Sequence, residues 1–127
     1  MLRTAILTIF CAAALAGTAQ AQTAATQAPK AQPLKFWNLT TETITELKLA
    51  EPGTDRWGRN QTLNDRDKTV EADERLKLSD VTPGVWDVSV KDRKKRACVL
   101  RNVTLSGTDA YAFPISEDDM ATCAKKK

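Results

Sequence analysis

A loop with two glycines carries the side chains best suited to contact a ligand. The stretch GTDRWGRN places Trp57 between Arg56 and Arg59. An indole flanked by guanidinium groups offers an aromatic and cationic surface to a glycan, a peptide or an anionic ligand. The competing interpretation is structural: Trp57 folds back to close the open end of a β-sandwich, while Gly53 and Gly58 permit the turns.

A second candidate lies in the acidic stretch NDRDKTVEADE. Its carboxylates fall close together along the chain, at Asp65, Asp67, Glu71 and Asp73. Oxygen ligands of this kind suit calcium or a trivalent lanthanide, so cation binding is the alternative function. The match to a calcium loop is incomplete, because Val70 stands at the sixth position from Asp65, where Gly is needed. The remaining interpretations are a carboxylate-based hydrolase and a solvated connection.

The chain contains no His. This excludes Ser-His-Asp and Cys-His catalysis and the His-based zinc, copper and iron sites. A domain of about 100 residues also leaves little room for a deep substrate cleft beside its core. We therefore expect a binding or interaction module of unknown ligand that is not an enzyme and carries no cofactor.

The balance of positive and negative charge bears on the class of partner. The sequence balances 19 Lys and Arg against 16 Asp and Glu, with both signs interspersed. Such a surface indicates solubility, whereas a nucleic-acid-binding face is strongly and locally basic. We expect a monomer whose partner is a protein or a ligand of the cell envelope, and no nucleic-acid partner.

The first 21 residues have the pattern of a cleavable export signal. A positive start at Arg3 precedes the apolar residues 4–17 and a small-x-small ending at Ala21. The apolar run is too short to span a bilayer as a helix. Cys11 lies inside this run, where a lipid attachment site is not expected, so we predict no stable membrane anchor. The predicted location is the periplasm or the medium.

The rest of the chain divides into a tether and one domain. Residues 22–33 hold no large apolar side chain, which predicts a flexible linker between the signal and the fold. Residues 34–127 have the length of a single domain, and no repeat is apparent in them.

Signal removal leaves two cysteines, Cys98 and Cys123. In an oxidising compartment a lone pair of thiols usually forms a disulfide. Closing the loop of 25 residues between them stabilises a fold by about 3 kcal/mol in the chain-entropy model. The alternative is a redox or metal-binding pair, but redox cysteines are more often two residues apart and a metal site favours His.

Short alternating segments between turn residues predict an all-β fold. Residues 41 and 42 predict a tight hairpin between the first two strands. In the expected strand of residues 85–91, Trp86, Val88 and Val90 should point inward and Asp87 outward. Residues 98–105 have apolar side chains on both faces, which predicts either burial on both sides or a bulge. The expected strands are residues 34–40, 43–49, 74–78, 85–91, 98–105 and 111–115.

After the segment from Tyr111 to Ile115, the alternation of apolar and polar residues that is typical of a strand ends. Ser116 is a favourable helix N-cap, and residues 117–119 place negative charge in the first turn. This predicts a short helical turn, which the disulfide would attach to the strand beginning at Cys98. The predicted fold is therefore a small antiparallel β-sandwich with a short C-terminal helical turn pinned by a disulfide.

This arrangement resembles a group of small exported bacterial domains without a characterised function. The resemblance covers most of residues 34–123 and implies a compact β-sandwich-like domain with no established activity. The charged residues 64–74 depart from the pattern. The pattern consists of an Asn and a Thr in the first strand (residues 36–40), Ile44, the Gly-x-Asp-x-Trp-Gly loop of residues 53–58, and Pro83, Gly84 and Asp87.

Overall fold

The computed structural model describes residues 33–106 and 112–125. The predicted signal (residues 1–21), the predicted tether apart from Pro33, and Tyr111 lie outside the described residues. No helix in the described part is long and apolar enough to span a membrane. The elements of this part are β1 (Lys35–Leu39), β2 (Ile44–Ala50), the 3₁₀ helix η1 (Gln61–Asn64), β3 (Arg75–Lys77), β4 (Gly84–Asp92), β5 (Ala97–Leu105), β6 (Phe113–Ser116) and α1 (Glu117–Lys125).

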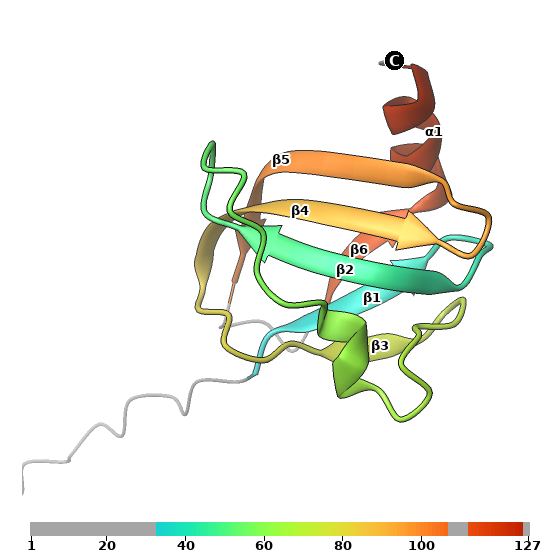
Figure 1. The fold of residues 1–127 in the computed structure, drawn as a ribbon, viewed down its shortest axis with the longest axis horizontal. Helices are drawn as coiled ribbons and strands as arrows, with labels where there is room; N and C mark the ends of the chain where they lie inside the picture. The colour runs from blue at the N-terminus through green and yellow to red at the C-terminus, as the bar shows by residue number, and fades with distance from the viewer. Residues whose placement is uncertain (1–32, 107–111, 126–127) are drawn as a thin grey trace, which may run out of the picture.

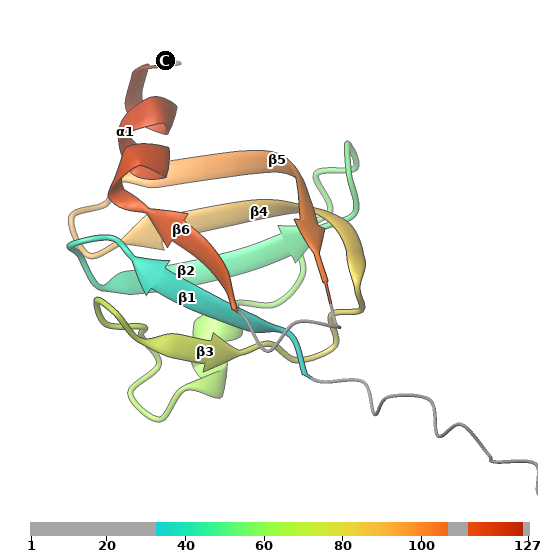
Figure 2. The same ribbon diagram turned by 180° about the vertical axis from the view of Figure 1, so that it is seen from behind.

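The strands form two three-stranded sheets. One has the order β3-β1-β6 and the other β2-β4-β5. Figures 1 and 2 show them from opposite sides, with α1 beside the end of the second sheet. Neighbouring strands are antiparallel except β1 and β6, which run parallel. The predicted β-sandwich with a short C-terminal helix is confirmed.

Alternating apolar side chains from both sheets form the core. Phe36 of β1 is fully buried, and its ring lies 5.3 Å from that of Phe113 in β6. The other sheet contributes Leu47, Val88 and Val90, all of which are fully buried. Burial of these side chains follows from the period-two geometry of a strand, which sends alternate residues to one face.

The predicted hairpin between the first two strands is wrong. β1 and β2 belong to different sheets, so the short connection crosses from one sheet to the other. Buried Asn38 directs this crossing: its Oδ1 accepts hydrogen bonds from the backbone N–H and hydroxyl of Thr40. Its amide group donates to the carbonyl oxygens of Glu42, Val70 and Glu71. These bonds satisfy a buried amide that would otherwise cost folding free energy.

The C-terminal helix begins as predicted. The Ser116 hydroxyl accepts from the N–H of Asp119, and the Asp119 carboxylate accepts in return from the N–H of Ser116. This reciprocal arrangement is a capping box. The Cys98–Cys123 disulfide, with 5.3 Å between the Cα atoms, joins α1 to β5 and confirms the predicted pair.

A second contact holds the start of α1. Arg96 donates to buried Asp92 at 2.6 Å and also pairs with Glu117, whose carboxylate accepts from the N–H of Thr41. Arg96, and to a smaller degree Thr41, lower the pKa of Glu117 to about 2. The ion pairs of Arg96 connect the turn after β4 to the helix, and the hydrogen bond from Thr41 connects the helix to the crossing between the sheets.

Candidate functional site

The loop that follows β2 contains the predicted ligand-binding residues. It first turns at Gly53, whose φ of +74° favours a residue without a Cβ. It then returns to its own strand, where the N–H of Gly58 donates to the carbonyl oxygen of Leu49 at 2.9 Å. A Cβ at Gly58 would lie 3.3 Å from that same oxygen. Gly58 therefore permits a close approach of two backbones.

A buried carboxylate holds this loop against the second sheet. Asp87 in β4 is 1% exposed and accepts three hydrogen bonds. The donors are the N–H of Gly53 at 3.0 Å, the N–H of Asn102 at 2.9 Å and the guanidinium of Arg101 at 2.7 Å. One donor comes from the loop and two come from β5, so Asp87 ties the loop to the sheet.

The prediction that Asp87 is exposed is wrong: the loop at Gly53 and two residues of β5 cover its carboxylate, and a bulge in β5 places these two residues. Trp86 pairs with Val103 but Val88 pairs with Leu100, so two residues of β5 lie opposite one of β4. The extra residue turns the backbone N–H of Asn102 toward the Asp87 carboxylate, with Asn102 at a φ of +55°. Of the two alternatives that the sequence left open for this segment, burial on both sides or a bulge, the structure shows the bulge.

Arg101 extends the same network to the exposed side of the loop. Its guanidinium bridges Asp87 and Asp55, the second at 2.9 Å, and lies 5.8 Å from the centre of the Trp57 ring. Planar guanidinium groups suit this combination of carboxylate pairing and aromatic contact. Sequence reasoning missed Arg101, because only the bulge brings it beside the loop.

The charge states within this network are fixed near neutral pH. The N–H of Gly53, the guanidinium of Arg101 and the N–H of Asn102 lower the pKa of Asp87 to about 2. Asp87, with a smaller contribution from Asp55, raises the pKa of Arg101. A carboxylate that is ionised and already bonded to three donors cannot serve as a general acid near neutral pH.

We expect Asp87→Asn to reduce the acid sensitivity of folding. The Asp87 pKa is lower in the folded than in the unfolded chain, so its contribution to stability is present above about pH 4 and is lost as pH falls toward about 2. The variant removes this contribution, so its free energy of unfolding should change less with pH in that window and be lower than the parent's near neutrality. Urea denaturation at several pH values measures both effects.

The exposed carboxylate Asp118 provides the control, as Asp118→Asn removes the same charge without touching the loop. Glu117 contributes to acid sensitivity in the same direction as Asp87, so part of the pH dependence should persist in Asp87→Asn. Parallel curves for the parent and Asp87→Asn would contradict the role assigned to this carboxylate.

The three predicted ligand-binding side chains have separate partners. Arg56 is largely exposed and lies 3.5 Å from Glu51, whereas Arg59 donates to Asn64 at 2.9 Å. Trp57 is half-buried beside Arg101. The structure therefore places the three residues on one loop without joining them to one another.

The competing interpretation of Trp57 as a plug is not supported. The partly buried apolar side chains that pack against the core include Trp86 but not Trp57. Two shallow hollows flank the loop instead. One, of about 400 Å³, is lined by Gly53 and Asp55 together with Arg101, and the other, of about 280 Å³, by Arg56 and Trp86.

The acidic stretch does not assemble into a metal site. Among the described residues, no group of three or more Asp, Glu or Cys side chains has an arrangement that could hold a metal ion. Asp65 instead accepts from the N–H of Asp67 within its own turn, and Asp73 accepts from the indole of Trp37 at 2.9 Å. Glu71 is exposed, and its backbone N–H donates to the carboxylate of Glu74. The geometry favours the solvated connection over a calcium or lanthanide site.

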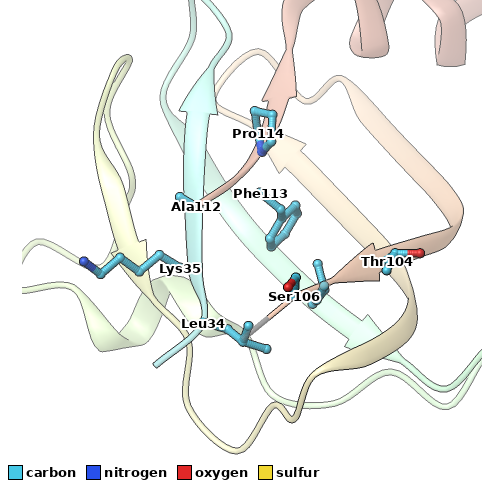
Figure 3. A pocket seen from close by; sticks show the side chains of 8 residues that line it. Leu34, Lys35, Thr104, Ser106, Ala112, Phe113 and Pro114 are labelled. Atoms are coloured by element: carbon cyan, nitrogen blue, oxygen red, sulfur yellow. The ribbon is translucent and has the colours of Figure 1, made fainter. Parts of the chain in front are cut away.

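A third hollow lies where the two sheets separate. It has a volume of about 210 Å³ and mostly apolar walls, and none of the described residues that line it is an Asp, Glu or Cys (Figure 3). Its lining includes Leu34, Phe113, Ser106 and Ala112. The chain between the last two lies outside the described residues, so we assign no occupant to this hollow.

Comparisons of the chain with protein-family models, with curated proteins and with solved structures found no match.

Proposed function

We propose that this protein is an exported, non-enzymatic binding module that contacts its ligand through the loop after β2. The binding surface consists of Arg56, Trp57 and Arg59, and we name it the loop surface. One observation carries the proposal: buried Asp87 commits its hydrogen bonds to fixing an exposed loop in place.

Fixing the loop lowers the cost of binding. A flexible loop loses conformational entropy when a ligand orders it, whereas a loop already held by hydrogen bonds loses less. Asp87 holds the first turn through Gly53, and Arg101 holds the next residues through Asp55. Binding groups placed on a rigid scaffold in this way are typical of recognition loops.

The exposed groups indicate the class of ligand. The guanidinium of Arg56 is largely exposed, and its contact with Glu51 is a surface ion pair of little energetic value. It is therefore available to a carboxylate, a phosphate or a sugar hydroxyl, while the half-buried ring of the next residue, Trp57, supplies an aromatic surface. A glycan, a peptide or a small anionic ligand of the cell envelope fits these groups.

The chemistry of the buried polar groups supports binding over catalysis. The sequence has no His, and the buried carboxylates Asp87 and Asp92 are each committed to an Arg and to backbone N–H groups. Every buried side-chain nitrogen and oxygen in the described residues has a hydrogen-bond partner. The two buried carboxylates therefore stabilise the fold and are not free to act on a substrate.

The location belongs to the same proposal. The Cys98–Cys123 disulfide fits an oxidising compartment, and residues 1–21 have the pattern of an export signal. We propose a periplasmic or secreted monomer without a stable membrane anchor and without a nucleic-acid partner.

Affinity capture tests the loop surface. The protein is expressed with its own signal in the source cells, crosslinked mildly, purified and examined by mass spectrometry for attached proteins and small molecules. We expect at least one species to be retained by the parent and weakened by about 30-fold or more in R56A/W57A/R59A, because Trp and Arg dominate binding surfaces.

A matched variant shows whether the loss is specific. K91A/R93A/K95A removes exposed cations from other parts of the domain and should retain the same species. The free energies of unfolding of both variants show that the fold persists. If every species bound by the parent is also bound by the folded loop variant, the proposed surface is wrong.

A further inference from the structure

The outer face of the β3-β1-β6 sheet carries a second, separate set of exposed side chains. Strand alternation directs Phe36 and Asn38 inward, which leaves the other residues of β1 on the outer face. In Figure 2 this sheet lies in front of the other one. The outward residues, which we name the cationic sheet face, are Lys35, Trp37, Leu39, Arg75, Lys77 and Pro114.

Two like charges lie directly opposite each other on this face. Lys35 of β1 pairs in register with Lys77 of β3, and like charges at such positions destabilise a sheet. In the close view of Figure 3, the Lys35 side chain extends across β3, away from Phe113. The fold therefore tolerates a local repulsion that an anion would relieve.

The cations of this face lack the carboxylate partners that other lysines have. Within the described residues, no Asp or Glu forms an ion pair with Lys35, Arg75 or Lys77. On the other sheet, by contrast, Lys48 and Lys91 both pair with Glu46. One carboxylate, Asp73, lies at the edge of the face, where it accepts from the indole of Trp37.

Apolar and aromatic groups lie among these charges. The Arg75 guanidinium stacks on the Trp37 ring at 3.9 Å from its centre. Leu39 is 39% exposed at the end of the same strand, and exposed Pro114 is the register partner of Trp37 in β6. Cations beside an indole and exposed apolar side chains are typical of proteins that rest on a bilayer surface.

We propose that the cationic sheet face binds reversibly to an anionic lipid bilayer. Charge complementarity supports an anionic partner, and the combination with Trp37, Leu39 and Pro114 favours a surface that is both charged and apolar at its boundary. This peripheral contact goes beyond the loop surface, which lies on the other sheet, so the two proposals can fail independently.

Vesicle sedimentation tests this proposal. The protein, purified from an export-competent host, is mixed with vesicles of phosphatidylglycerol and phosphatidylcholine in equal parts, and separately with pure phosphatidylcholine. We expect binding to the anionic vesicles alone, and weaker binding when salt rises from about 0.1 M to about 1 M. In K35Q/R75Q/K77Q the partition coefficient should fall by about 100-fold, because each cation near an anionic surface contributes roughly fivefold.

A charge-matched variant separates this face from net charge. K91Q/R93Q/K95Q removes three exposed cations that belong to neither proposed surface and should retain most of the binding. An equal loss in both variants, or no binding of the parent to anionic vesicles, would overturn the proposal. The parent is also tested on dextran sulfate beads: capture there without vesicle binding would assign the face to an acidic polymer and likewise overturn the lipid assignment.

Discussion

Replacing Phe36 with Ala is expected to lower the free energy of unfolding by about 4 kcal/mol. The Phe36 ring is fully buried between the two sheets and contacts the ring of Phe113. The substitution removes apolar surface from the core and leaves a cavity that a sheet sandwich closes only partly. Since a small domain has a total stability of roughly 5–15 kcal/mol, urea denaturation should show a large shift of the midpoint.

Leu63→Ala is the matched control for a lost apolar side chain. Leu63 is 52% exposed in η1, so its truncation should change the stability by less than about 0.5 kcal/mol. If Phe36→Ala does not fold, Phe36→Leu still allows the contribution of this core side chain to be measured, and it should lower the free energy of unfolding by less. A loss below about 1 kcal/mol in Phe36→Ala would contradict the assigned core.

Removing the disulfide should cost about 3 kcal/mol. The bond closes a loop spanning 25 residues and thereby restricts the unfolded chain. Cys98 is buried, so Ala is used at both positions to avoid placing an unpaired hydroxyl in the core. Chemical denaturation of C98A/C123A compared with the parent measures the loss.

Reducing agent provides an independent check of this second prediction. The parent in excess dithiothreitol should approach the stability of C98A/C123A, whereas C98A/C123A itself should not respond to the reagent. Equal stability of the parent and the double variant, without reducing agent, would show that the bond does not stabilise the fold.

The strand pattern of the sequence predicted most of the architecture. Alternation identified the buried residues Val88 and Val90 correctly, because the period of a strand is a local property. The cysteine pair could also be predicted, since only two cysteines follow the predicted signal. The helix start at Ser116 followed from local capping chemistry.

Partner strands could not be predicted in the same way. A short polar connection after β1 is compatible with a hairpin and equally with a crossing to the other sheet. The choice depends on Asn38, whose hydrogen bonds reach Val70 and Glu71, more than 30 residues away along the chain. Such long-range contacts have no signature in a local window.

The site was predicted in part. The sequence identified the loop, in which Arg56 is exposed and Trp57 half-buried, but not the two side chains that fix it, Asp87 and Arg101. Both depend on contacts that local alternation does not show: the bulge in β5 places Arg101 and the N–H of Asn102 opposite Asp87, and the loop at Gly53 covers this carboxylate. The Asp in the Gly-x-Asp-x-Trp-Gly pattern now has a structural role, because Asp55 pairs with Arg101.

The proposal depends most directly on the domain working outside the cytoplasm. The decisive measurement is the intact mass of the protein isolated from the source cells, with and without thiol alkylation. We predict a chain beginning at Gln22, recovered from the envelope or the medium, with Cys98 and Cys123 resistant to alkylation until reduced. A cytoplasmic chain that retains residues 1–21 and alkylates at both of these cysteines would contradict the account.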